Sequence, residues 1–173
     1  MSVHIIIDGY NLIRRSHRLS ALDQRELQLG REALLDTLAA YRRNCLHKIT
    51  VVFDGASAPD LFFSSERTRG IEVTYSHQGE SADAVIKRMA ARKKEKALVV
   101  TSDRDIIDYV SARGAATIDS LSFEQKIAEA LYGDIELSGA ENEGGWTPTT
   151  RKKGPGHRAS KKERRNMKKI NKL

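Results

Sequence analysis

Three apolar runs along the chain are each followed by aspartate, and this repeated ending constrains the fold more than any other feature of the sequence. The runs and the acids that follow them are residues 3–7 with Asp8, residues 48–53 with Asp54, and residues 97–101 with Asp103 and Asp105. Their β-branched, apolar character predicts strands buried on both faces, as in a parallel sheet. Because the carboxyl ends of parallel strands meet at one edge of a sheet, we expect these carboxylates to lie close together.

Helical patterns separate the strand patterns, and this alternation predicts a three-layer α/β domain with a parallel five-stranded sheet. A helix is expected over residues 24–44, because Leu27, Leu34, Leu38 and Tyr41 recur on one helical face. Further helices are expected at about 82–94, after Asp103, and from Ser120. The segment 55–70 reads as a loop, 71–75 as an edge strand and 115–118 as a fifth strand. If the acids meet, the strands follow the order 71–75, 48–53, 3–7, 97–101, 115–118 (order 3-2-1-4-5).

A metal ion would explain why acids gather at one edge. Carboxylates brought together raise each other's pKa unless a cation neutralises them, and oxygen ligands favour Mg²⁺ or Mn²⁺. Asp83, just after the helix-capping residue Ser81, would add a fourth carboxylate. A simpler interpretation stays open: Asp8 only caps the next helix, and Glu80 and Asp83 only complement a helix dipole.

Other site types find little support in the sequence. The five histidines are scattered without metal-ligand spacing, and Gly9 and Gly55 form no nucleotide-binding fingerprint. Cys45 is the one cysteine and is expected to pack in the core. The sequence contains no apolar run near 18 residues and no signal-peptide pattern, so we expect a cytoplasmic protein without a membrane anchor.

Charge divides the chain into an acidic body and a basic tail. Residues 151–173 carry eleven Lys or Arg and one acid, a net charge of +10, which leaves −3 for residues 1–150. We expect a domain over 1–132, an acidic, Gly-rich linker over 133–150 and a disordered, RNA-binding tail over 151–173. Few aliphatic side chains lie in this tail, namely Met167, Ile170 and Leu173. A merely solubilising tail or a nuclear-localisation signal would have a similar composition.

Four short motifs, taken in their order, resemble the YacP-like NYN domain, a branch of the PIN-like nuclease fold. They are Asp8-Gly9-Tyr10-Asn11, Phe53-Asp54-Gly55, Ser81-Ala82-Asp83 and Thr101-Ser102-Asp103-Arg104-Asp105. The resemblance covers about residues 1–132. It implies a metal-dependent endoribonuclease in which Asp8, Asp83 and Asp103 are catalytic and hold Mg²⁺, with Asp105 as a further ligand. Asn11, which matches the family's Asn, is expected to order the turn or the substrate.

Several residues are expected to support this site or bind the substrate. They are Asn11, Asp54, Glu80, Ser102, Arg67, Arg69 and Arg104. We expect Arg67 and Arg69 to form a ledge beside the acids with Phe62 and Phe63, on which a single strand stacks. Phe side chains that anchor the loop from below are the alternative.

The expected partner is RNA, either mRNA or rRNA, and the ribosome is an abundant candidate for the basic tail to bind. Two other functions remain open. A phosphatase on a similar fold would need a second Asp two residues after Asp8, where this chain has Tyr10. A non-catalytic RNA-binding module would need no intact set of acids.

Overall fold

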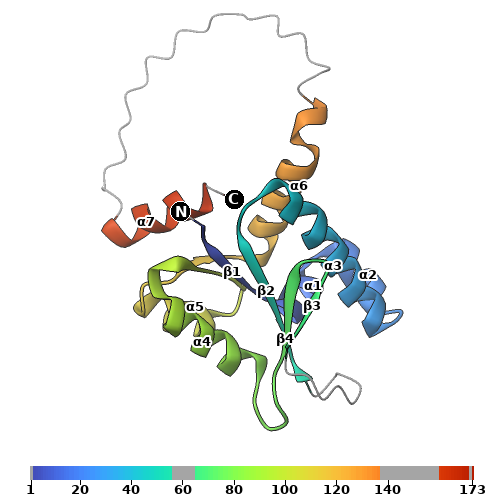
Figure 1. Ribbon diagram of the computed structural model, residues 1–173, viewed down its shortest axis with the longest axis horizontal. Coiled ribbons are helices and arrows are strands. Elements are labelled where there is room, and N and C mark those ends of the chain that lie inside the picture. The colour runs from blue at the N-terminus through green and yellow to red at the C-terminus, as the bar shows by residue number, and fades with distance from the viewer. Residues whose placement is uncertain (1, 56–64, 137–159, 172) are drawn as a thin grey trace, which may run out of the picture.

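A computed structural model of the chain describes residues 2–55, 65–136, 160–171 and 173. These residues form one six-stranded sheet in the order β3-β4-β2-β1-β5-β6, with helices on both faces (Figure 1). The strands are β1 (His4–Asp8), β2 (Lys48–Phe53), β3 (Ser65–Thr68), β4 (Ile71–Tyr75), β5 (Ala97–Val100) and β6 (Ala116–Ile118). The helices are α1 (Gly9–Arg15), α2 (His17–Asp23), α3 (Leu27–Asn44), α4 (Ala82–Lys93), α5 (Arg104–Ala112), α6 (Ser120–Glu136) and α7 (Lys161–Ile170), with the short 3-10 helix η2 (Lys94–Lys96) before β5.

The five strands that the sequence predicts all form, and they lie in the predicted order. β4, β2, β1, β5 and β6 are parallel to their neighbours. β1 lies between β2 and β5, where the strand order reverses, which is the point at which open α/β sheets bind ligands. The carboxyl ends of β1, β2 and β5 therefore lie side by side.

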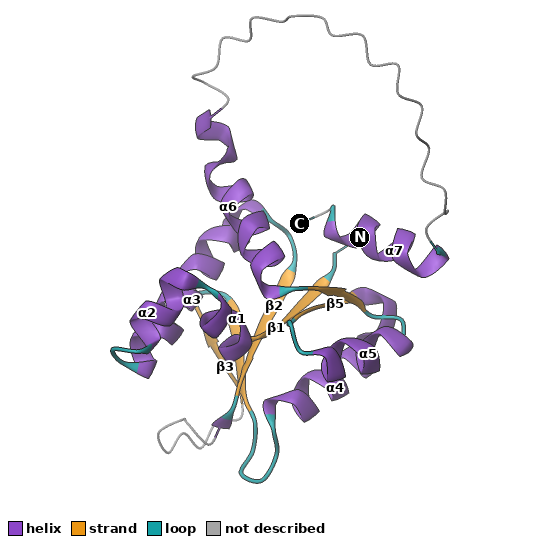
Figure 2. Ribbon diagram, turned by 180° about the vertical axis from the view of Figure 1, so that it is seen from behind, coloured by secondary structure: helices purple, strands orange, loops and turns teal. Residues whose placement is uncertain are grey.

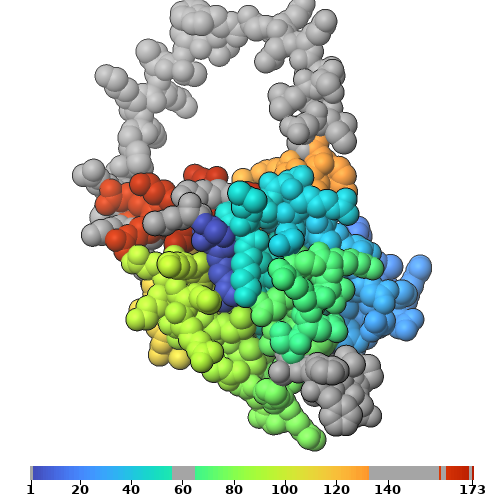
Figure 3. All heavy atoms as spheres, in the orientation of Figure 1, coloured from blue at the N-terminus to red at the C-terminus, as the bar shows by residue number. Residues whose placement is uncertain are grey.

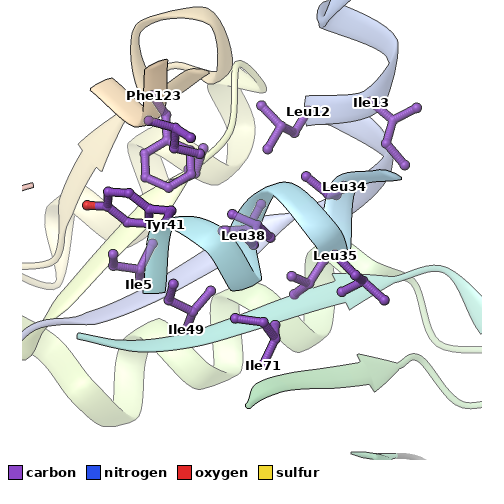
Figure 4. Packing of buried hydrophobic residues seen from close by; sticks show 14 of the residues in the cluster. Ile5, Leu12, Ile13, Leu34, Leu35, Leu38, Tyr41, Ile49, Ile71 and Phe123 are labelled. Atoms are coloured by element: carbon purple, nitrogen blue, oxygen red, sulfur yellow. The ribbon is translucent and has the colours of Figure 1, made fainter. Parts of the chain in front are cut away.

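Two apolar clusters cover the two faces of the sheet, because successive side chains of a strand point to opposite faces. From β1, Ile5 and Ile7 enter one cluster and Ile6 enters the other. Helices α1, α3 and α6 cover the first face, and α4 and α5 cover the second (Figure 2). In the first cluster Phe123 of α6 packs edge-on against Tyr41 of α3, with ring centroids 6.1 Å apart (Figure 4). The predicted three-layer architecture is confirmed.

The prediction of a purely parallel sheet is wrong at one edge. β3 pairs antiparallel with β4, so residues 71–75 lie inside the sheet and part of the expected loop 55–70 is a strand. β3 contains no apolar residue, and its hydrophobic pattern therefore gives no strand signal. Arg69 and Gly70 join β3 to β4 with φ values of 53° and 83°, and two positive φ values are typical of a type I′ hairpin turn. Arg-Gly is not one of the strong sequence signals for that turn.

The expected disorder of the basic tail is wrong for residues 160–171. These residues form α7, whose first turn is closed by reciprocal hydrogen bonds between Ser160 and Glu163. The side-chain amide of Asn166 binds the outer edge of β6: it accepts from the Thr117 N–H at 2.9 Å and donates to the Thr117 carbonyl at 3.0 Å. Strand β6 therefore has α7 as its neighbour on the outside.

Further contacts, from the end of α7 and from Leu173, fasten this segment to the first apolar cluster. Ile170 and Leu173 pack against that cluster, and the Tyr41 hydroxyl donates a hydrogen bond of 2.8 Å to the Leu173 carbonyl. In Figure 3 this segment, in red, lies at the same end of the molecule as the start of the chain, in dark blue. Three aliphatic residues are too few to build a core of their own, but Ile170 and Leu173 join one that the rest of the chain has already built.

None of the helices among the described residues combines the length and the apolar character that crossing a membrane requires.

Candidate active site

Asp8 is the last residue of β1, the strand at the middle of the reversal in strand order. Its carboxylate accepts hydrogen bonds from the Asn11 backbone N–H and from the Thr101 hydroxyl, each at 3.2 Å. The first bond makes Asp8 the N-cap of α1, as the simpler interpretation proposed. The second fixes the other carboxylate oxygen at the end of β5. Asp8 thus caps a helix and also lies at the acidic edge.

The environment of Asp8 opposes its ionisation. The residue is only 8% exposed. Burial raises its pKa to about 6, and the nearby charges of Asp83 and Asp103 act in the same direction. A carboxylate with such a pKa is poorly compensated by the surrounding protein, which is common at functional sites.

Asp103 stands two residues beyond the buried Thr101 and is the N-cap of α5. Its carboxylate accepts from the Asp105 backbone N–H at 2.8 Å, and its own N–H donates to the Thr101 hydroxyl oxygen at 3.1 Å. The single hydroxyl of Thr101 therefore contacts both Asp8 and Asp103. These bonds set the direction of both acids before any ligand arrives.

Asp83 lies in the first turn of α4, where Ser81 is the N-cap and accepts from the Ala84 N–H. Burial raises the pKa of Asp83, and the charges of Asp103 and Asp105 raise it further. Asp83 comes from α4, yet its carboxylate lies close enough to Asp103 and Asp105, which follow β5, to be affected by their negative charge. The predicted fourth carboxylate does reach the strand edge.

One cavity unites these acids. It has a volume of about 330 Å³, and we call it the acidic cavity. It is lined by Asp8, Tyr10, Asn11, Arg14, Arg15, Asp54, Ala82, Asp83 and Asp103. Five of the residues that the sequence predicts for the site therefore lie around one space at the carboxyl edge of the sheet.

Asn11 holds the turns behind this cavity together. Its side-chain oxygen accepts from the Ser102 backbone N–H at 3.0 Å and from the Ser120 hydroxyl at 2.8 Å. The Ser102 hydroxyl oxygen in turn accepts from the Ser120 N–H at 3.3 Å. Asn11 and Ser102 thus join the start of α1, the end of β5 and the start of α6. Both residues act in ordering the turns.

Close packing explains the glycines that follow two of the acids. A Cβ on Gly9 would lie 2.3 Å from the ring of Phe53, so a larger residue would push α1 away from β2. A Cβ on Gly55 would lie 2.0 Å from the Ser76 carbonyl oxygen. In each of the two Asp-Gly pairs, an acid of the cavity is therefore followed by a position that has no room for a side chain.

Three other predicted residues lie outside the acidic cavity. The Asp105 carboxylate is exposed and forms an ion pair with Lys87. Glu80 forms an ion pair with Arg88, which lowers the pKa of Glu80. Arg104 is exposed at the start of α5. None of the three lines the space around Asp8, so the expectation that Asp105 is a direct metal ligand gains no support from the geometry.

The expected ledge of Arg67 and Arg69 beside the acids is wrong. Arg69 forms an ion pair with Asp36 of α3, and Arg67 lies opposite Glu72 in the β3–β4 pair. Arg67 lines a different cavity, of about 700 Å³, together with residues that precede β1 and β2. That cavity lies toward the amino ends of the parallel strands, away from the acids. Phe62 and Phe63 lie outside the described residues.

The two arginines of the acidic cavity, Arg14 and Arg15, were not among the residues predicted for the site. Both are exposed at the end of α1, and the Arg14 guanidinium lies 5.7 Å from the ring centroid of Tyr10. The sequence signal that could have indicated them is their spacing from Asp8, which is about two turns of a helix. Thr101 and Ser120 were missed as well, because their contacts appear only when β5 and α6 are placed next to α1.

A family model of the YacP-like NYN domain matches residues 5–172, almost the whole chain. The chain belongs to the YacP-like NYN domain family. Members of the NYN family are generally nucleases that act on RNA. The match extends through α7, whereas the resemblance in the sequence motifs ended near residue 132. The helix that docks on β6 is therefore inside the region that the family model covers.

Similar proteins come from Bacillus subtilis. The protein called uncharacterized protein YacP, of strain 168, is 28% identical over 86 residues, which make up 50% of each chain, so our chain aligns with about half of that relative. The crystal structure of Rae1 (YacP) is similar with a TM-score of 0.64 and 25% identity, over 80% of this chain and 79% of that chain. A mutant of Rae1 gives a TM-score of 0.65 and 23% identity, over 79% and 80%.

The resemblance to NYN nucleases implies a divalent metal ion, and the acidic cavity offers oxygen ligands of the kind that Mg²⁺ prefers. The raised pKa of Asp8 and of Asp83 reflects negative charge that such a cation would neutralise. Among the described residues, however, no three His, Cys, Asp or Glu side chains form a group that could hold a metal ion. An ion in this cavity would therefore have to keep several of its waters, as Mg²⁺ usually does.

Proposed function

We propose that this chain is a metal-dependent endoribonuclease that hydrolyses RNA phosphodiester bonds in the acidic cavity. One observation carries the proposal: Asp8, Asp54, Asp83 and Asp103, from four separate segments, line a single cavity at the carboxyl edge of the sheet. Burial also raises the pKa of Asp8 to about 6, and acids with such raised pKa values are common at functional sites. Membership of a family of nucleases supports the same activity.

The residues of the acidic cavity would have different roles in this reaction. Asp8, Asp83 and Asp103 would bind Mg²⁺ or Mn²⁺ partly through the ion's own waters, and the ion would supply a water of lowered pKa and neutralise charge on the phosphate. Thr101 fixes the direction of the Asp8 carboxylate and holds the backbone of Asp103, so little reorganisation is needed when substrate binds. Arg14 stands at the rim and binds the phosphate oxygens of the RNA.

A phosphatase is less well supported by the geometry. The position that would need a second acid holds Tyr10, which is buried and packs edge-on against Phe53 with ring centroids 5.1 Å apart. Tyr10 therefore serves the packing of α1 on β2. A non-catalytic RNA-binding protein remains as the competing outcome of the experiment below.

The basic end of the chain would bind RNA away from the acidic cavity. Arg164 and Lys168 lie one turn apart on α7 and are exposed. The docked helix presents them as a fixed surface, and the net charge of +10 over residues 151–173 supplies the attraction that the acidic body lacks. A large RNA assembly such as the ribosome suits a contact of this kind.

The test is cleavage of bulk RNA and of a labelled oligonucleotide, in Mg²⁺, in Mn²⁺ and in EDTA. We expect wild type to cleave only with metal, and Asp8→Asn and Asp103→Asn to lose cleavage by at least about a hundredfold. Asparagine still caps a helix, so both variants should fold. The matched control is Asp108→Asn, which changes an exposed acid of α5 outside the cavity. Metal-dependent binding without any cleavage would favour the non-catalytic RNA-binding protein.

A further inference from the structure

Beside the acidic cavity, a second hollow runs along the outer surface of α4 and α5. It has a volume of about 520 Å³ and is lined by Ala84, Lys87, Arg88, Ala91, Arg92 and Tyr109. Its charged lining is entirely cationic, and we call it the basic groove. The two alanines lie two helical turns apart on α4, and because their side chains are small they leave room between the long cationic side chains.

A tyrosine ring holds cations in place at this groove. The Arg113 guanidinium lies 3.4 Å from the ring centroid of Tyr109 and also donates to the Tyr109 carbonyl at 3.1 Å. The Lys87 ammonium lies 5.6 Å from the same centroid. Contacts of a cation with an aromatic face restrict long side chains that would otherwise move freely in solvent. The groove therefore presents partly ordered positive charge.

Lys87 connects the basic groove to the acidic cavity. It follows Asp83 by one helical turn on α4 and forms an ion pair with Asp105. The pKa of Lys87 is raised mainly by this ion pair, and the charges of Asp83 and Asp103 raise it further. A strand that leaves the acidic cavity past Asp83 meets Lys87 first, and then the cations farther along α4.

We infer that the basic groove binds the sugar-phosphate backbone of single-stranded RNA on one side of the bond that is cut. This assignment rests on the proposed nuclease function. Charge complementarity selects the occupant, because a groove lined by positive side chains is how proteins follow a single strand without reading its sequence. Ala84 of the groove directly follows Asp83 of the acidic cavity in α4, so the flanking nucleotides would need only to follow this helix to reach the groove.

Two of the groove's cations already have acidic partners, and this affects how binding occurs. Lys87 is paired with Asp105, and Arg88 is paired with Glu80. Surface ion pairs contribute little to stability, so phosphate groups can replace these carboxylates at small cost. Arg92 also lines the groove, Arg113 lies beside it on the ring of Tyr109, and both arginines are exposed. They are the positions at which a substitution should affect RNA binding without disturbing the acids.

The experiment compares Arg92→Gln/Arg113→Gln with a control that removes the same charge elsewhere, Arg25→Gln/Arg43→Gln, where both arginines are exposed near the ends of α3. Binding of a long single-stranded RNA is measured over a range of salt in the Asp103→Asn background, which separates binding from cleavage. We expect the groove variant to bind about tenfold more weakly, and the slope of log affinity against log salt to fall by about 1.4. The control should change much less.

Cleavage gives the second readout. In otherwise wild-type protein, we expect the groove variant to cut a dinucleotide at the normal rate and to lose about tenfold in kcat/KM on the long RNA. If groove and control variants bind and cut alike, the groove assignment is overturned while the nuclease function stands. If duplex RNA loses as much affinity as single-stranded RNA, the groove is a general polyanion surface and the assignment to a single strand is wrong. Absence of cleavage in wild type would refute the nuclease, and the binding data would still test the groove.

Discussion

The hydroxyl of Thr101 donates a hydrogen bond of 3.2 Å to the buried carboxylate of Asp8 in the neighbouring strand. The same oxygen accepts from the Asp103 backbone at 3.1 Å, so one small side chain links two acids of the cavity. Thr101 is fully buried, and its contacts therefore form without competition from bulk water.

Thr101→Val should weaken both the fold and the activity. Valine has a similar shape but no hydroxyl, so the Asp8 carboxylate loses a donor and the Asp103 N–H loses its acceptor. We expect the free energy of unfolding to fall by about 1–3 kcal/mol and metal-dependent cleavage to fall at least about tenfold. Denaturant titration and kcat measure the two effects. Thr101→Ser keeps the hydroxyl and should retain most of the activity; equal losses in both variants would argue for a packing effect.

Asp8→Asn should make the metal-free protein more stable while it abolishes cleavage. Folding raises the pKa of Asp8 from 3.8 to about 6, so the ionised carboxylate at neutral pH opposes folding. We expect a gain of about 1–2 kcal/mol at pH 7 in EDTA. Wild type should approach the variant's stability as the pH falls from 7 toward 4, because Asp8 becomes protonated. A less stable Asp8→Asn protein at pH 7 would contradict this account.

His4 should make the fold sensitive to acid. Its ring nitrogen Nε2 lies 2.7 Å from the Thr50 hydroxyl, and burial lowers its pKa to about 4, with help from Lys48 and Lys93. Because folding lowers this pKa from 6.5, stability is lost as the pH falls from about 6.5 to about 4. We expect a loss of up to about 3 kcal/mol over that window.

The Asp8→Asn background suits this measurement, since Asp8 contributes with the opposite sign over nearly the same range of pH. There, His4→Gln should flatten the dependence of unfolding free energy on pH, while His17→Gln, at an exposed position, should leave the slope unchanged. An unchanged slope in His4→Gln would show that another group causes the acid sensitivity.

Asn166→Ala should destabilise the whole domain although residue 166 belongs to the basic tail. The substitution removes two hydrogen bonds to the backbone of Thr117, and we expect a loss of about 1–3 kcal/mol in chemical denaturation. The control is Asn171→Ala, which changes an exposed asparagine at the end of the same helix. The prediction fails if both variants unfold at the same denaturant concentration.

Arg164→Gln/Lys168→Gln should weaken binding of long RNA and reduce its dependence on salt. These exposed cations contribute to the surface of α7, and each phosphate that the variant no longer neutralises should lower the slope of log affinity against log salt by about 0.7 for a single strand. Cleavage of a short oligonucleotide should be unaffected. Equal affinities of variant and wild type at every salt concentration would leave the tail's charge without a role in RNA binding.

The sequence was informative about the acids because their positions follow from strand ends. Asp8, Asp54 and Asp103 could be placed at one edge from the apolar runs alone, and the requirement that they meet also determined the strand order. Asp83 needed a further assumption, since it comes from a helix. Its placement in the cavity supports that assumption.

Other features depend on contacts that no local pattern records. β3 is polar throughout, so no alternation of side chains reveals it. Helix α7 has too few aliphatic residues to fold alone, and it forms where a neighbouring strand and an existing core receive it. The basic residues were the hardest to place, because charge alone does not say which face a side chain occupies. Arg67 and Arg69 lie far from the acids, whereas Arg14 and Arg15 line the cavity.

The contact between Asn166 and β6 also affects how this protein resists aggregation through the edges of its sheet. An outermost strand with unpaired N–H and carbonyl groups invites another chain to add a strand of its own, which begins aggregation. At the opposite border of the sheet, β3 is short and carries Glu66 and Arg67, which discourage such pairing. At β6 that protection comes from the amide of Asn166, so a variant that releases α7 should self-associate before its acidic cavity is damaged.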